Sequence, residues 1–325
     1  PLSSRQQAGG YPVEFSMKLM EKALVKLGMA PKPMLDIGLP VMSAKAILTA
    51  TKLGIFDKLS DRMLSVPELA QELNANERGI PILVEALAAA GYLKREGINY
   101  KNTRVAQKWL TSRSPTYLGN MAKHFDDLWT FWGGLGEAVT TGKPPIDAYQ
   151  YFRENSEAQR NFILGNKDIA VFCADEMISK IRVPPRARKL LDLGGAHSYY
   201  SVQFCRKYPQ LTSLVLDWQK PVEIGQEVVK QEGLLDRIQF KVGDYITDDI
   251  GCGYDIVLMF ALLHADSPET SLSTVKKVYS ALNPGGVVAI SDTLSYKGNK
   301  ESQLGLLFAL NMLVCTPSGQ TYRYD

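Results

Sequence analysis

Three aspartates lie in or directly after three successive apolar runs in the second half of the chain. Their carboxylates are suited to bind the hydroxyl and amino groups of a nucleoside. Asp192 lies within the first run, Asp217 ends the second, and Asp244 follows the third. In parallel sheets, ligands bind outside the carboxyl ends of the strands. We therefore predict that Asp217 accepts hydrogen bonds from two ribose hydroxyls and that Asp244 accepts one from an adenine amino group.

A glycine pair, Gly194-Gly195, follows the first run and allows the backbone to turn sharply and approach a ligand closely. Proteins that bind a nicotinamide dinucleotide use Gly-x-Gly-x-x-Gly, in which a helix N-terminus meets the pyrophosphate. Here the segment reads Gly-Gly-Ala-His-Ser-Tyr-Tyr, without a later glycine. S-adenosylmethionine (SAM) has no pyrophosphate, so the sequence favours SAM over a dinucleotide as the ligand.

His264 stands just beyond the fourth apolar run, at the edge where the ligand is expected. A phenol has a pKa near ~10 and is mostly protonated at neutral pH, whereas a histidine with a pKa near ~6.5 can take its proton. His264 is thus a candidate general base, and a structural loop histidine is the alternative. We interpret His197 as a loop-packing residue or a cofactor contact, and His124 as a surface or lid residue.

A parallel sheet would bring these residues together, and the sequence from Arg186 onward has the pattern of one. Short apolar runs, interpreted as strands, alternate with amphipathic segments, interpreted as helices. This alternation is typical of βαβ units and of a doubly wound, Rossmann-like α/β sheet. The expected strands are Lys189–Leu193, Ser213–Leu216, Ile238–Val242, Tyr254–Phe260 and Val287–Ile290, and the expected helices are Tyr199–Tyr208, Val222–Glu232 and Pro268–Leu282.

The first part of the chain is predicted to be helical and to end in a hairpin. Ser65 followed by Glu68 three residues later resembles a capping box. Helix, helix, hairpin is the order of a winged helix, but the second helix offers one arginine and few groups that could reach DNA bases. We therefore expect a dimerisation module whose apolar helices form a homodimer interface. The expected helices are Tyr11–Leu27, Ile37–Leu53, Ser65–Leu73 and Asn76–Ala90, and the hairpin strands are Tyr92–Arg95 and Ile98–Lys101.

The segment of residues 111–185 is helical in pattern and rich in aromatic residues. Core packing explains most of these rings, and a minority is expected to line a pocket for an aromatic substrate. The chain is accordingly divided into a winged-helix-like dimerisation domain (1–110), a helical connector and substrate lid (111–185), and a SAM-binding catalytic domain (186–325).

The composition excludes several other classes of protein. The chain is 45% hydrophobic and 22% charged with a net charge of +3, which is typical of a globular protein and too small to indicate nucleic-acid binding. Its four cysteines and three histidines show no spacing of metal ligands, so we predict no metal site and reduced thiols in a cytoplasmic protein. The longest apolar stretch is too short to span a membrane. A winged-helix regulator that senses a metabolite is the alternative from a different class, and its support is the basic charge over residues 92–108.

Residues from about 35 to 325 resemble the plant caffeate-type and acetylserotonin-type O-methyltransferases and their bacterial relatives. Asp192-Leu-Gly-Gly-Ala-His-Ser198 is similar to the family's Asp-x-Gly-Gly-Gly-x-Gly. Leu262-Leu-His-Ala-Asp266 resembles its Leu-His-Asp-Trp segment, in which the histidine is the general base. Asn283-Pro-Gly-Gly286 is similar to its Lys-Pro-Gly-Gly turn, and Pro317-Ser-Gly319 to its Asn-Pro-Gly-Gly.

The resemblance implies a homodimeric SAM-dependent O-methyltransferase that produces S-adenosylhomocysteine (SAH). In such an enzyme His264 is the general base and Asp292 orients its ring. The cofactor contacts that the resemblance and the motifs imply are Asp192, Gly194, Gly195, Ser198, Asp217, Trp218, Asp244, Tyr245 and Phe260. The expected substrate contacts are Phe131, Trp132, Phe162, Met312 and Thr316.

The sequence departs from the family pattern at several of these positions. Ala196 and Ser198 replace two glycines, and the Ser198 side chain is expected to crowd the methionine moiety or to hydrogen-bond to it. Ala265 replaces an aspartate beside the base, and Asp292 and Thr321 stand where plant enzymes have glutamates. The chain also ends at Asp325, before the family's last helix and strands. A C- or N-methyltransferase of the same fold, acting for example on a tetrapyrrole or polyketide, and a SAM-binding relative with altered chemistry are therefore the alternatives.

Overall fold

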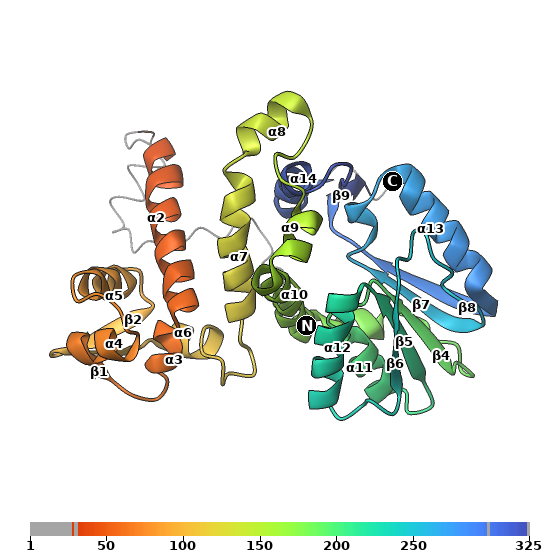
Figure 1. Ribbon diagram of the computed structural model, residues 1–325, viewed down its shortest axis with the longest axis horizontal. Helices are drawn as coiled ribbons and strands as arrows, with labels where there is room; N and C mark the ends of the chain where they lie inside the picture. The colour runs from red at the N-terminus through yellow and green to blue at the C-terminus, as the bar shows by residue number, and fades with distance from the viewer. Residues whose placement is uncertain (1–27, 29–31, 298–299, 324–325) are drawn as a thin grey trace, which may run out of the picture. The chain divides into compact units, whose positions relative to one another are not determined.

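The computed structural model describes residue 28, residues 32–297 and residues 300–323 (Figure 1). It consists of two compact units, Pro1–Ser114 and Pro115–Asp325. The helix expected at Tyr11–Leu27 lies outside the described residues. Within the described residues, no helix combines the length and the apolar character needed to cross a membrane.

The first unit is mainly helical and has a small antiparallel sheet of strand order β1-β3-β2. The backbone N–H of Ser65 donates to Glu68 at 2.7 Å, in the expected capping box at the start of α4. α4, α5 and the β2–β3 hairpin then follow in the expected order of helix, helix, hairpin. The elements are α2 (Lys32–Leu53), α3 (Ile55–Lys58), β1 (Leu64–Ser65), α4 (Val66–Glu72), α5 (Gly79–Ala89), β2 (Leu93–Glu96), β3 (Asn99–Asn102) and α6 (Arg104–Trp109).

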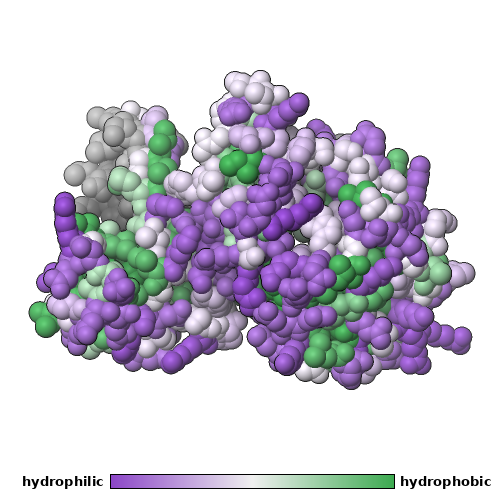
Figure 2. Space-filling view, in the orientation of Figure 1, coloured by the Kyte–Doolittle hydropathy of each residue, from purple (hydrophilic) through white to green (hydrophobic). Residues whose placement is uncertain are grey.

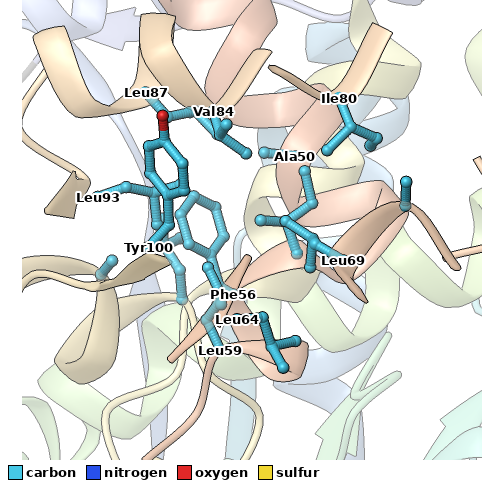
Figure 3. Packing of buried hydrophobic residues seen from close by; sticks show 14 residues of the cluster. Ala50, Phe56, Leu59, Leu64, Leu69, Ile80, Val84, Leu87, Leu93 and Tyr100 are labelled. Atoms are coloured by element: carbon cyan, nitrogen blue, oxygen red, sulfur yellow. The ribbon is translucent and has the colours of Figure 1, made fainter. Parts of the chain in front are cut away.

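A single apolar cluster holds this unit together, as Figure 3 shows. Phe56, Leu69 and Leu87 are almost completely buried there, and Tyr100 joins the hairpin to the helices. The start of α2, by contrast, exposes large apolar side chains to solvent, and Figure 2 shows green, hydrophobic atoms over this helix. They are Ile37, Leu39, Val41 and Met42.

The second unit is built on a five-stranded parallel sheet of order β6-β5-β4-β7-β8. Its strands are β4 (Lys189–Leu193), β5 (Thr212–Asp217), β6 (Ile238–Val242), β7 (Tyr254–Phe260) and β8 (Leu282–Ser291). The connecting helices include α11 (Tyr199–Lys207), α12 (Gln219–Gln231) and α13 (Pro268–Ala281). Apolar clusters cover both faces, which explains why the inner strands are continuous apolar runs. The expected Rossmann-like α/β fold with an N-terminal helical domain is thus confirmed.

The order of the strands determines where a ligand can bind. From β4 the chain proceeds to β5 and β6 on one side, and it later continues with β7 and β8 on the other side. The direction of winding therefore reverses between β4 and β7, and a crevice forms outside the carboxyl ends of strands at such a switch point. The glycine turn after β4 and His264 after β7 both stand at this edge.

The second unit also contains helices that come before and after the sheet strands along the chain. They are α7 (Gly119–Trp132), α8 (Leu135–Thr141), α9 (Ala148–Glu154), α10 (Ser156–Ser179) and α14 (Gln303–Cys315). One apolar cluster joins α7, α8, α9 and α10 to α14, and it includes Phe131, Phe152 and Val314. A small sheet of β10 (Lys300–Glu301), β9 (Leu294–Lys297) and β11 (Tyr322–Arg323) follows β8.

Candidate active site

The turn after β4 requires both of its glycines. Gly194 has a φ of +66°, in the left-handed region that favours glycine, and a Cβ there would lie 2.6 Å from the Leu262 side chain. A Cβ on Gly195 would lie 2.6 Å from the carboxyl carbon of Asp192. Gly194 is therefore favoured by its backbone conformation, and at Gly195 the backbone passes closely over the Asp192 carboxylate.

Asp192 itself is buried beneath this turn. Its carboxylate accepts a hydrogen bond from Ser201 Oγ at 2.7 Å, and Ser201 Oγ lies 2.8 Å from Ser213 Oγ. Burial raises the pKa of the Asp192 carboxyl to about 6. Asp192, which is 2% exposed, thus links the end of β4 to α11 through Ser201, and Ser201 in turn contacts β5.

Ser198 adopts a left-handed conformation with a φ of +59°, at a position where the family pattern has glycine. Its side chain is fully buried, and its Oγ has no hydrogen-bond partner among the described residues. A Cβ on Gly225 of α12 would lie 2.6 Å from that Oγ, so the hydroxyl faces α12. The left-handed backbone costs a residue with a side chain about 1 kcal/mol.

Asp217 ends β5 and meets the glycine turn directly. Its Oδ2 accepts from the Ala196 N–H at 2.9 Å, and its Oδ1 accepts from the Trp218 N–H at 2.7 Å. Burial is the main cause that raises the pKa of this carboxyl to about 6. An ionised carboxylate has about four acceptor positions, so Asp217 keeps capacity for two further donors such as a pair of hydroxyls.

A cleft of about 520 Å³ opens beside Trp218 and contains two of the expected cofactor residues, Trp218 and Asp244. Asp244 Oδ1 accepts from the Ile246 N–H at 2.9 Å. The sequence analysis missed the opposite wall, which comes from α9 and α10. Its members are Arg153, Ser156 and Gln159.

Aromatic and cationic groups position Trp218 at this cleft. The Arg153 guanidinium lies over the Trp218 ring at 4.0 Å from the centroid, and the Tyr149 ring meets it edge-on at 6.2 Å. Burial raises the pKa of the Tyr149 phenol above its usual range. Tyr149 was another residue that the sequence analysis did not identify.

The two remaining expected cofactor residues flank the strand ends. Tyr245 donates its hydroxyl proton to Asp266 Oδ2 at 2.7 Å, and the Lys277 ammonium donates to the Tyr245 carbonyl at 2.8 Å. These bonds fix the loop that follows β6. Phe260 ends β7 and packs edge-on against Tyr200, with 4.8 Å between the ring centroids.

His264 and Asp292 form a close pair at the ends of the neighbouring strands β7 and β8. His264 lies in η1 (Leu263–Ala265), and its Nδ1 is 2.6 Å from Asp292 Oδ1. The His264 backbone N–H donates to Asp292 Oδ2 at 3.1 Å, and Thr293 N–H donates to Oδ1 at 2.7 Å. An ionised carboxylate can only accept, so it places the ring proton on Nδ1 and leaves Nε2 as an acceptor.

The segment after α14 closes over the backbone of this histidine. Gln320 N–H donates to the His264 carbonyl at 2.9 Å, and a Cβ on Gly319 would lie 2.6 Å from the same oxygen. Thr316 Oγ1 donates to the Met312 carbonyl and accepts from Gly319 N–H, so its single donor is used within the turn and one acceptor lone pair remains. The Phe308 ring meets the His264 ring edge-on at 4.9 Å.

The residues expected to contact the substrate occupy different environments. Phe131 is 1% exposed and packs edge-on against Phe152 inside the apolar cluster, which is a core position. Trp132 Nε1 donates to Asn311 Oδ1 at 2.9 Å and thereby joins α7 to α14. Phe162 stacks on Phe152 with 5.0 Å between centroids. Met312 and Thr316 are both buried.

The other two histidines are buried as well. His124 was expected at the surface or in a lid, and the surface position is wrong: it is 8% exposed and lies among Phe125, Phe152 and Phe162. Its Nδ1 has no hydrogen-bond partner among the described residues, and burial lowers its pKa to about 4. His197 Nδ1 accepts from the Tyr199 N–H at 3.1 Å, as suits a residue that packs the loop.

Comparisons with known proteins agree with this architecture. An O-methyltransferase domain model matches residues 132–324, and an O-methyltransferase dimerisation domain model matches residues 38–112. The chain is 28% identical to the tetracenomycin polyketide synthesis 8-O-methyl transferase TcmO of Streptomyces glaucescens, over 90% of this chain and 87% of that protein. It is 27% identical to acetylserotonin O-methyltransferase of Gallus gallus, over 84% and 83% of the two chains.

Among solved structures, human N-acetylserotonin methyltransferase in complex with SAM has a similar fold. The TM-score is 0.80 at 21% identity, and the match covers 94% of this chain and 90% of that one. The domain model alone spans more than half of the chain. The chain therefore belongs to the O-methyltransferase family, and it is a SAM-dependent O-methyltransferase.

Proposed function

We propose that this enzyme transfers the methyl group to a hydroxyl of a small aromatic molecule, and that His264 is the general base. The observation that carries the proposal is the His264–Asp292 pair, with Nδ1 and Oδ1 2.6 Å apart at the carboxyl ends of β7 and β8. This pair lies at the strand edge where the winding of the sheet reverses. The names of two relatives, which refer to a polyketide and to acetylserotonin, support an aromatic acceptor.

The residues at the strand ends fit SAM as the cofactor. Asp217 retains acceptor capacity for two ribose hydroxyls, and Asp244 faces the cleft where an adenine amino group would donate to it. Trp218 and Tyr245 would enclose the adenine, and the backbone at Gly194, Gly195 and Ser198 would face the amino-acid part. Asp192 would act beneath the turn by holding it in place, and Phe260 by packing the strand end. When bound, SAM supplies a methyl group on a sulfonium that is already electrophilic.

The chain's own residues then have to activate the acceptor. His264 Nε2 accepts the proton of the hydroxyl, so that the oxygen becomes a better nucleophile as the new bond forms. The Asp292 carboxylate keeps the other ring proton on Nδ1 and stabilises the charged ring that results. The Phe308 ring, which meets the His264 ring, would limit the access of water to this point, and the buried Met312 would belong to the same side of the site. In this proposal Trp132, Phe162 and Thr316 belong to the walls of the acceptor site, and Phe131 supports them from the core.

We further propose that the enzyme is a homodimer in the cytoplasm and that the segment 111–185 covers the acceptor. The match to a dimerisation domain and the exposed apolar side chains of α2 support the homodimer. Four cysteines without a disulfide support a reducing compartment. The contacts of α7 with α10 and with α14 support a cover over the strand ends.

Turnover with a panel of acceptors tests this function. The purified enzyme is incubated with isotopically methyl-labelled SAM and phenols, hydroxylated polyketides, aromatic amines and carbon nucleophiles. We expect labelled methyl ethers, identified by mass spectrometry and by the carbon chemical shift of the methyl group. Products labelled only on nitrogen or carbon would contradict the proposed hydroxyl acceptor.

A further inference from the structure

Gln159 of α10 has an unusual environment at the wall of the cleft. It is 6% exposed, yet it lines the cleft beside Trp218 and Asp244. Within the part of the chain that the structure describes, its side-chain amide makes no hydrogen bond. Its exposed edge faces a cavity, and polar groups so placed usually give a binding site its specificity.

The wall formed by α9 and α10, which carries Gln159, contacts α12, and α12 begins at the opposite wall of the cleft. Arg153 stacks on Trp218, and Trp218 is the N-cap residue of α12. The next residue after Gln159 along the chain, Arg160, forms an ion pair of 2.7 Å with Glu227 of α12. Asp147 begins α9 by accepting from the N–H groups of Tyr149 and Gln150. Gln159 is therefore held at a defined distance from Trp218 by contacts on both sides.

We propose that Gln159 is a cofactor-binding residue whose amide hydrogen-bonds to the adenosine half of SAM. This inference rests on the proposed binding of the ribose and adenine by Asp217 and Asp244. The amide has both donors and an acceptor, which suits the mixed donors and acceptors of a ribose and an adenine. On the same wall Arg153 stacks on Trp218 and Ser156 is exposed, whereas Gln159 is buried and its amide bonds to no other described residue.

Calorimetric binding of two ligands tests this assignment. SAH contains both halves of the cofactor, whereas 5′-methylthioadenosine keeps the adenosine half and lacks the amino-acid part. The variant Gln159→Met keeps the length of the side chain and removes the amide. Gln150→Met is the matched control, because Gln150 is exposed on α9, bonds to Glu154 and does not line the cleft.

We expect Gln159→Met to weaken both ligands about five- to tenfold, the scale of one net hydrogen bond. Gln150→Met should bind both like the unmodified protein. Unchanged affinity of Gln159→Met for both ligands would overturn the assignment, as would a loss for SAH alone or a change confined to the KM of the acceptor. If Gln159→Met lowers the melting temperature, Gln159→Glu replaces it and should weaken both ligands through loss of the donors.

Asp217→Asn in the same assay separates this inference from the proposed function. Weaker SAH binding by Asp217→Asn together with normal binding by Gln159→Met would leave the proposed site in place and remove Gln159 from it. Normal binding by both variants would contradict both the site and the assignment.

Discussion

Replacing Asp292 by Asn should lower kcat about 10- to 150-fold without loss of SAH affinity. The carboxylate accepts three hydrogen bonds, from His264 Nδ1, from His264 N–H and from Thr293 N–H. The amide keeps the shape but loses the charge that fixes the ring proton on Nδ1. Hydrogen bonds to a charged group contribute about 1.5–3 kcal/mol, and each 1.36 kcal/mol changes a rate about tenfold.

Initial rates at saturating SAM and acceptor, measured from pH 6 to 9, provide the assay. His264→Gln should lose about 10²–10⁴ in kcat, because it lacks the base altogether. The double variant should be no slower than His264→Gln alone, since the two residues act as one unit. Asp255→Asn is the matched control, because Asp255 also accepts from two backbone N–H groups but stands at the start of β7.

The reasoning would be refuted by a folded Asp292→Asn enzyme with a kcat within twofold of the unmodified one across this pH range. Such a result would mean that orientation of the His264 ring does not limit the reaction. A large loss in SAH affinity by the same variant would also contradict it, because Asp292 would then belong to the cofactor site.

Three further outcomes follow from the charges and surfaces described above. SAH affinity should fall as the pH drops through about 6. Burial raises the pKa of Asp217 to about 6, and protonation of this carboxylate removes acceptor capacity. The affinity of Asp217→Asn for SAH, measured by calorimetry, should not change over the same pH range. Between pH 7 and pH 5, the free energy of unfolding measured in urea should fall by about 2 kcal/mol less in His124→Phe than in the unmodified protein. The native His124 has a pKa of about 4 and an unfolded histidine one near ~6.5, so acid favours unfolding between these values; equal losses in both proteins would count against this burial. Ile37→Glu combined with Met42→Glu should give a monomer in sedimentation at micromolar concentration where the unmodified chain is a dimer, and a persistent dimer would place the interface elsewhere.

The inner strands of the catalytic sheet, β4 and β7, could be predicted because each is an apolar run that is buried on both faces. β4, β6 and β7 have the bounds expected from sequence. β8 begins at Leu282, before the expected Val287, because Leu282 pairs with Tyr254 across an irregularity in the ladder. The Pro-Gly-Gly sequence inside that stretch indicates a turn. A local sequence pattern does not show that the residues on both sides of the turn pair with β7.

The carboxylates and the histidine at the strand ends could be predicted for the same reason, since strand order places them at one edge. The buried position of His124 had a signal that was overlooked: it shares a helix face with Leu128 and Phe131 at spacings of four and seven. For Arg153 and Gln159 no local pattern exists. Trp218, which Arg153 contacts and which lines the same cleft as Gln159, is about 60 residues away in sequence, and only the packing of α9 and α10 brings them together.

The central claim is that His264 takes the proton of the acceptor hydroxyl at the carboxyl ends of β7 and β8. The most direct measurement is a crystal structure of the enzyme with SAH and a phenolic substrate that it methylates. The account predicts a distance of about 2.6–3.2 Å from His264 Nε2 to the acceptor oxygen, with the SAH sulfur facing that oxygen. An acceptor oxygen that contacts another base, or a sulfur that lies away from His264, would contradict it.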